Sequence, residues 1–155
     1  MNWDRTRPGE TEVPLPDRSD GRLVFIGRIR TPFLTRDDCP RRGYPDGPEC
    51  RIEVDEPWRG GLQGIEAFAQ LEILYWMHQA RRDLVTQNPK RSGVIQGTFS
   101  VRSPVRPNPI ATSEVRLERV ETWGLVVRGL DCVDGTPLLD IKPARGEFRP
   151  VGPEA

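Results

Sequence analysis

Residues 112–120 alternate between two kinds of side chain, and this period of two constrains the fold more than any other feature of the sequence. Val115 and Leu117 fall on one face of an extended segment together with Ser113, and the charged side chains between them fall on the other. This pattern is typical of a β-strand with one buried face and one face in water. Trp123-Gly124 then marks a chain reversal into the apolar run 125–127. The pair predicts an antiparallel hairpin.

Further strands are predicted from short runs of β-formers, at residues 23–30, 51–55, 71–78, 94–101 and 138–141. The segment 71–78 would also suit a short helix by pattern alone. Asp134-Gly135 is a favourable hairpin dipeptide, so it predicts a second reversal before the last strand. Pro57 suits a helix start, and the glycines that follow it limit 57–68 to one or two helical turns.

The composition agrees with an all-β chain that has many turns. Only 35% of the residues are hydrophobic, and the chain has 16 prolines and 15 glycines. These values predict a small core with short strands rather than a helical bundle. Short strands joined by hairpins favour an antiparallel barrel or sandwich. No Gly-x-Gly-x-x-Gly segment is found, so a Rossmann-type cofactor site is not supported.

At 155 residues the chain is expected to form one domain. Residues 1–21 are polar and lack periodicity, so we predict a disordered or extended N-terminal arm. The predicted β-barrel domain covers 22–148, and 149–155 form a C-terminal tail. Residues 37–49 and 81–92 are predicted to be charged loops, and a long loop in a small domain is often functional.

Charge and cysteine content limit the partners. The net charge is zero, so any RNA contact needs a local basic patch, and we expect no DNA binding. Residues 90–119 are the most positive region; such a charge run is more often a solvated face, but the stiff loop within it favours an anionic partner more than usual. A zinc site would need all three cysteines, Cys39, Cys50 and Cys132, with the lone His78, so we predict no metal. No segment has the length of a membrane span or the pattern of a signal peptide. We therefore expect a cytoplasmic protein with reduced thiols and no membrane contact.

The segment 102–110 is the least ordinary stretch of the chain. Its three prolines alternate with other residues, fix three φ angles and push their predecessors toward extended conformations. The result is a stiff strip that carries Arg102, Arg106 and Asn108. An arginine held in this way can grip a carboxylate or a phosphate through two hydrogen bonds. A proline-rich connection with solvated arginines is the equally weighted alternative.

The segment 130–143 places several charges around a tight turn. Asp140 and Lys142 are two positions apart on a predicted strand, so they share one face. An aspartate or a turn carbonyl could accept a hydrogen bond from an adenine amine or face a sulfonium cation. A hairpin with turn-forming aspartates and a surface ion pair is the alternative that the residues alone favour.

His78 ends the apolar run 73–77. A lone histidine in such a place is usually a satisfied core or rim residue. As a general base it would need a nucleophile beside it, and no serine or cysteine can be paired with it from the sequence. No hydrolase triad is visible.

Taken together, these segments resemble the TsaA-like family, which includes TrmO and the VirR-type proteins. The resemblance spans roughly residues 24–144. It lies in the segments 26–33, 65–68, 78–79, 97–103, 106–110 and 131–143. The two longest motifs, at 97–110 and 131–143, stand at the right separation and make the resemblance specific.

The resemblance implies a single-sheet antiparallel β-barrel with short helical turns, usually a homodimer, that binds S-adenosylmethionine. In TrmO the methyl acceptor is N6 of threonylcarbamoyladenosine in tRNA. Carried over by position, the cofactor-binding residues are Pro40, Arg41, Arg42, His78, Gln79, Arg102, Thr112, Asp131, Cys132, Val133 and Asp134. Arg106, Asn108, Asp140 and Lys142 fall in the same motifs as substrate-binding candidates, and no catalytic residue is assigned.

We therefore expect the stiff arginine strip 102–110 and the aspartate-bearing turn 131–134 to come together around the cofactor. Arg102 would hold the methionine carboxylate, and Asp134 or a turn carbonyl would orient the adenine amine. The chain departs from the family pattern at residues 69–72, at Ala111 and at Ala144. Bacterial TrmO also carries a further C-terminal domain. The alternatives are methylation of another RNA or a small molecule, and a non-catalytic S-adenosylmethionine-binding module.

Overall fold

The computed structural model describes residues 3–146, and the predicted C-terminal tail lies outside this range. The chain forms two compact units, which are described separately. The barrel unit comprises Val24–Trp76 and the segment that begins at Thr112. The second unit comprises the segment that ends at Leu23 together with Met77–Ala111.

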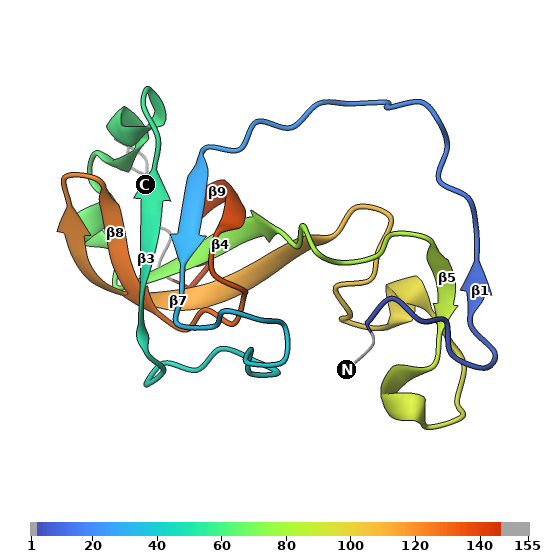
Figure 1. Ribbon diagram of the computed structural model, residues 1–155. Helices are drawn as coiled ribbons and strands as arrows, with labels where there is room; N and C mark the ends of the chain where they lie inside the picture. Colours follow the sequence, from blue (N-terminus) through green and yellow to red (C-terminus); the bar gives the residue numbers. More distant parts are fainter. Residues whose placement is uncertain (1–2, 147–155) are drawn as a thin grey trace. The chain divides into compact units, whose positions relative to one another are not determined.

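Six strands form a closed barrel around one core (Figure 1). In spatial order they are β2 (Gly27–Arg30), β3 (Glu49–Val54), β8 (Gly124–Arg128), β7 (Ile110–Glu121), β4 (Gln70–Trp76) and β9 (Thr136–Pro143). The pairings given by register are antiparallel. The predicted single-sheet antiparallel barrel is therefore confirmed. Closure leaves none of these six strands with an unpaired edge.

Alternating side chains fill the barrel. In β4 every second residue points inward, so that Leu71, Ile73 and Tyr75 are at most 1% exposed. The predicted face of β7 is confirmed as well, because Val115 is buried and Glu114 is exposed. The ambiguous segment 71–78 is thus a strand as far as Trp76, since only a period of two gives this burial pattern, and the predicted strand is wrong for residues 77–78, where the chain turns.

The Trp123-Gly124 reversal is confirmed, because β7 pairs with β8 through Glu121 and Gly124. Gly124 is required there for two reasons. Its φ is +150°, and a Cβ atom would lie 1.9 Å from the carbonyl oxygen of Ile52 on β3. The barrel unit also contains two 3-10 turns, Trp58–Leu62 and Ile65–Ala67, where one or two helical turns were expected.

The Asp134-Gly135 turn does not join a hairpin, which corrects one expectation. Gly135 adopts the positive φ of a turn, +79°. However, β8 already has β3 and β7 on its two edges, so the chain crosses to β9, which pairs with β2 and β4. Asp134-Gly135 therefore forms the predicted turn, but the pairing partners of β8 determine which strand follows it in the barrel.

The second unit holds a small sheet in the order β1 (Thr11–Glu12), β5 (Leu84–Gln87) and β6 (Gln96–Gly97). β5 lies within the predicted loop 81–92, because its buried Leu84 and Gln87 give this polar segment an inner face. The 3-10 turns Pro89–Arg91 and Thr98–Ser100 complete the unit. The predicted strand 94–101 is wrong beyond β6, since Val94 and Ile95 are exposed and the chain then turns at Thr98.

Part of the predicted N-terminal arm is paired in this sheet. The amide of Val13 donates to the carbonyl of Asp83 at 2.7 Å. Arg81, with a side chain only 11% exposed, contacts the carboxylates of Glu12 and Asp83 at 2.8 and 2.7 Å. Arg81 therefore ties the arm to the segment that follows β4.

Candidate functional site

The predicted site residues fall into both units. The barrel unit carries Pro40, Arg41, Arg42, Thr112, Asp131, Cys132, Val133, Asp134, Asp140 and Lys142. The second unit carries His78, Gln79, Arg102, Arg106 and Asn108. The expected meeting of Arg102 with Asp134 involves one residue from each unit and stays a prediction.

Asp131 connects three of the predicted segments of the barrel unit. Its Oδ1 accepts a hydrogen bond from the Tyr75 hydroxyl at 2.7 Å, and its Oδ2 accepts one from the Gly43 amide at 3.2 Å. The Tyr75 hydroxyl also lies 2.7 Å from Oγ of Ser113, the neighbour of Thr112. The loop 40–43, the start of β7 and the loop 131–134 are therefore held around one carboxylate.

Tyr75 is buried in the barrel at 1% exposure. Burial, followed by the adjacent Asp131 carboxylate, raises the pKa of the Tyr75 phenol above its ordinary value. The phenol therefore stays protonated and acts as a hydrogen-bond donor. Tyr75 was not predicted from the sequence, because an inward position on an alternating strand predicts packing and gives no sign of a polar partner. Gly43 was not predicted either, because it contributes only its backbone amide.

The loop 131–134 is also fastened to the end of β2. The carboxylate of Asp134 accepts from the Thr31 amide at 3.1 Å and lies 3.6 Å from the Arg30 guanidinium. The Thr31 hydroxyl donates to the carbonyl of Cys132 at 2.8 Å. Asp134 thus has local partners that hold the loop, and its carboxylate remains partly exposed, with 33% of the side chain accessible.

The cysteines close to this loop are protonated thiols. Burial raises the pKa of Cys50 to about 11 and also raises the pKa of Cys132. Partial burial and the nearby Asp131 and Asp38 raise the pKa of Cys39. Since the thiolate is the nucleophilic form, none of the three is activated for nucleophilic catalysis.

Arg41 and Arg42 supply positive charge beside the anchored carboxylate. Both side chains are exposed in the loop that reaches Asp131 through Gly43. Within residues 3–146, neither forms a salt bridge with another side chain. Two unpaired guanidinium groups next to a loop rich in carbonyl and carboxylate oxygens could bind a ligand that carries charges of both signs.

The arginine strip of the second unit is braced by its own residues. Arg106 donates to the carbonyls of Val101 and Ser103 at 2.7 and 3.3 Å, and its guanidinium carbon lies 5.9 Å from the centre of the Phe99 ring. Arg102 is exposed. Of the two guanidinium groups, Arg102 therefore faces solvent, whereas Arg106 stiffens the segment.

His78 and Gln79 lie in an exposed turn directly after β4. The amide of Met77 donates to the carbonyl of Pro109 at 2.8 Å, next to the exposed Asn108. Within the second unit, the turn and the end of the strip are therefore linked through the backbone. The expected role of these residues as ligand contacts stays a prediction.

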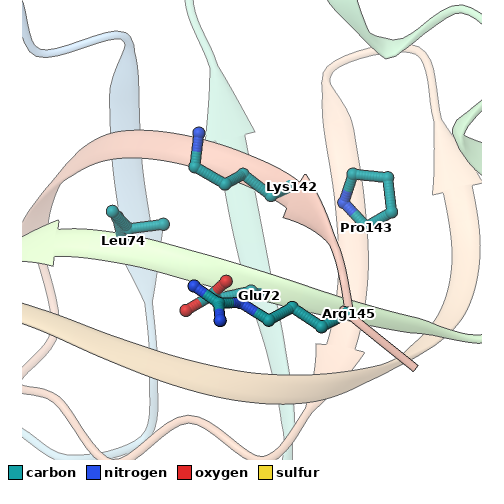
Figure 2. Close-up of a pocket in the computed structure, with 5 residues that line it drawn as sticks. All are labelled: Glu72, Leu74, Lys142, Pro143 and Arg145. Carbon is teal, nitrogen blue, oxygen red and sulfur yellow. The ribbon is translucent and has the colours of Figure 1, made fainter. Parts of the chain in front are cut away.

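Asp140 and Lys142 form the ion pair expected from their shared face, with Nζ 2.6 Å from the carboxylate. Lys142 also borders an open hollow of about 480 Å³ on the barrel (Figure 2). Glu72 and Leu74 of β4, Pro143 of β9 and Arg145 complete its lining. Both charges and apolar surface are present, and Glu72 and Arg145 were not singled out from the sequence.

The described part of the chain offers neither a metal-ligand group nor a helix that could span a membrane. Residues 3–146 contain no group of three or more histidine, cysteine or acidic side chains arranged to hold a metal ion. Over the same range, every helix is too short or too polar to cross a bilayer.

Residues 28–148 match the sequence model of a protein family, the tRNA-methyltransferase O N-terminal domain. The chain belongs to this TrmO N-terminal domain family. The match covers most of the barrel unit and the whole of Met77–Ala111 in the second unit. All predicted site residues lie within it.

Three known proteins resemble the chain to different extents. The probable S-adenosyl-L-methionine-binding protein VirR of Rhizobium radiobacter is 53% identical over 99% of this chain and 87% of its own length. The tRNA (adenine(37)-N6)-methyltransferase of Mus musculus is 41% identical over 56% of this chain and 21% of its own length. The crystal structure of TrmO from Pseudomonas aeruginosa matches with a TM-score of 0.67 and 30% identity. It covers 87% of this chain, which spans only 60% of that TrmO.

Proposed function

We propose that the protein is an S-adenosylmethionine-dependent methyltransferase that acts on N6 of an adenine in tRNA, and that the acceptor is threonylcarbamoyladenosine. The observation that carries the proposal is the group formed by Asp131, Tyr75, Ser113 and Gly43, the Asp131 cluster, in a chain of the TrmO family. There, Tyr75 and Gly43 hold together loops that the family resemblance assigns to the cofactor.

The charged and polar groups of the barrel unit fit the chemistry of S-adenosylmethionine. This cofactor has a carboxylate, an ammonium and a sulfonium on one side and a nucleoside on the other. The exposed Arg41 and Arg42 suit the carboxylate, and the partly exposed oxygens of the loop 131–134 suit the cationic or amine groups. Thr112 lies beside the anchored Ser113 as a further contact. His78, Gln79 and Arg102 of the second unit are proposed contacts from the family resemblance.

The chain needs no activated nucleophile for this reaction. When bound, the cofactor supplies a methyl group that is already activated by the sulfonium. The residues of the protein then have to orient the reactants and exclude water, and alignment alone can lower a barrier substantially. Protonated cysteine thiols and a rigid loop held around Asp131 agree with a catalyst of this kind.

The acceptor part of the proposal depends on charge. Threonylcarbamoyladenosine carries a carboxylate, which the exposed Arg102 or the strip braced by Arg106 could bind through paired hydrogen bonds. Asn108, Asp140 and Lys142 are the remaining substrate-binding candidates. The ion pair of Lys142 with Asp140 leaves the two side chains about half exposed, 54% and 45%, and so open to a polar ligand.

A reaction with purified protein tests the proposal. The protein would be incubated with S-adenosylmethionine and tRNA from a strain that lacks the methyl group, and the nucleosides would be analysed by mass spectrometry. We expect methylated threonylcarbamoyladenosine to accumulate. Tight cofactor binding without methyl transfer to any tRNA nucleoside would instead favour a non-catalytic binding module. The similarity to VirR, a probable S-adenosyl-L-methionine-binding protein, supports this alternative.

We also infer that the protein works in the cytoplasm as a homodimer, as the family resemblance implies. Light scattering coupled to size-exclusion chromatography would give a mass of twice 17.6 kDa if the dimer is correct. A mass of one chain at micromolar concentration would contradict it.

A further inference from the structure

We propose that Tyr75 is a positioning residue of the cofactor site. Its buried hydroxyl fixes the Asp131 carboxylate and the start of β7 in the arrangement that binds the cofactor. This inference rests on the proposed function and assigns a role to a barrel residue that lies outside the predicted set of cofactor contacts.

The position of the hydroxyl is fixed by the barrel. Tyr75 lies on β4, between the neighbouring strands β7 and β9. Its ring is packed with the inward residues of the core, at 1% exposure. Only its hydroxyl reaches polar atoms, at 2.7 Å from both Asp131 and Ser113. A rigid ring anchored in a core therefore sets where the carboxylate lies.

The protons of the network can be assigned from simple chemistry. The Asp131 carboxylate can only accept, so the single phenolic proton of Tyr75 is donated to it. The Tyr75 oxygen is then left as an acceptor, and Ser113 donates its own hydroxyl proton to it. The second carboxylate oxygen of Asp131 accepts from the Gly43 amide. The hydrogen bonds therefore all point one way: Ser113 of β7 donates to Tyr75, and Tyr75 donates to Asp131.

A phenylalanine would fill the same space in the core, so packing alone does not explain the hydroxyl. A buried hydroxyl without partners is costly, and here its two partners both belong to segments assigned to the cofactor. The network therefore couples the loop 40–43, the position beside Thr112 and the loop 131–134. Its loss should loosen all three segments together.

Tyr75→Phe tests the proposal, with Thr86→Val as the matched control. The Thr86 hydroxyl accepts from the Thr11 amide in the second unit and is not one of the hydrogen-bond partners around Asp131. For each purified full-length protein, the dissociation constant for S-adenosylmethionine would be measured by calorimetry and the melting temperature by circular dichroism. We expect Tyr75→Phe to raise the dissociation constant by about tenfold or more, because a hydrogen bond to a charged group is lost. Thr86→Val should leave it unchanged.

Two further readouts separate positioning from general destabilisation. The Gly43 amide should exchange its hydrogen faster in Tyr75→Phe, whereas amides of β3 and β8 should keep their protection. Ser113→Ala removes one partner from a half-buried position and should also raise the dissociation constant, by about threefold. If Tyr75→Phe does not fold, Ser113→Ala decides the outcome.

A dissociation constant within twofold of the wild type for both variants would overturn the role of Tyr75. A wild-type protein that does not bind S-adenosylmethionine would refute the proposed function itself. The two failures are therefore distinguishable in one set of measurements.

Discussion

Gly43 lies directly against the carbonyl oxygen of Gly129, so closely that a Cβ atom on Gly43 would be 1.7 Å from that oxygen. The contact brings the loop 40–43 onto the chain segment that leads from β8 to Asp131. Neither residue can move away freely, because the Gly43 amide is bonded to the Asp131 carboxylate.

Gly43→Ala should therefore displace the loop. We expect a loss of stability of about 2 kcal/mol, since a forced backbone shift costs as much as an overpacked core. Binding of S-adenosylmethionine should weaken at the same time. Gly61→Ala is the control, because a Cβ atom there would meet nothing within 4 Å. Equal chemical denaturation curves for the two variants would show that the close approach has no energetic effect.

Asp134→Ala should destabilise the protein more than Asp140→Ala. Asp134 accepts a hydrogen bond from the partly buried Thr31 amide and also faces Arg30. Its removal leaves a backbone donor without a partner and should cost about 1–2 kcal/mol. Asp140 accepts only from the amide of the adjacent Ile141, and its pair with Lys142 is about half exposed, so solvent screens the pair and the loss of Asp140 should cost less. Thermal unfolding of the two variants measures the difference, and the opposite order would contradict it.

The three thiols should react at different rates. All three thiols have raised pKa values, but Cys50 and Cys132 are buried, whereas Cys39 is partly exposed and open to a reagent. At pH 8 we expect one thiol to react quickly with a chromogenic disulfide and all three to react in denaturant. Because Cys39 is adjacent to Pro40, saturating S-adenosylmethionine should slow the fast reaction. An unchanged rate would argue against cofactor contacts in the loop 40–42.

The same thiols predict how stability depends on pH in alkali. The pKa of Cys50 is about 11 in the folded protein against an ordinary value of 9.0, so the unfolded chain releases this proton first. The unfolded state then binds fewer protons, and stability falls as the pH rises from about 9 to about 11. Cys50→Ala should lose this part of the pH dependence. Denaturant titrations at several pH values would test it, and identical slopes for the wild type and the variant would speak against it.

Arg81→Ala should release the N-terminal arm from the small sheet. The Arg81 side chain is nearly buried and its guanidinium contacts both Glu12 and Asp83, so its removal deprives both carboxylates of this cation. Hydrogen exchange at residues 11–13 should become at least about tenfold faster. Arg18→Ala is the control, because its pair with Asp20 is about 80% exposed. Unchanged exchange in Arg81→Ala would mean that the backbone pairing alone holds the arm.

The barrel could be predicted where side-chain alternation and burial agree. The face of β7 that carries Val115 follows from the period of two, and so does the Asp140–Lys142 pair. Val94 and Ile95 show the limit, because β-formers without a partner strand remain exposed. The contact of Tyr75 with Asp131 joins residues 56 positions apart. It depends on which strands become neighbours, and no local pattern encodes that.

The strand order gives the chain a modular character. Met77–Ala111 leaves the barrel at the end of β4 and returns at β7, and these strands are neighbours in the closed ring. An excursion between adjacent strands can lengthen, shorten or change in sequence without altering the register of the other pairings. The ring with its Asp131 cluster can therefore stay constant while the excursion changes in length or sequence.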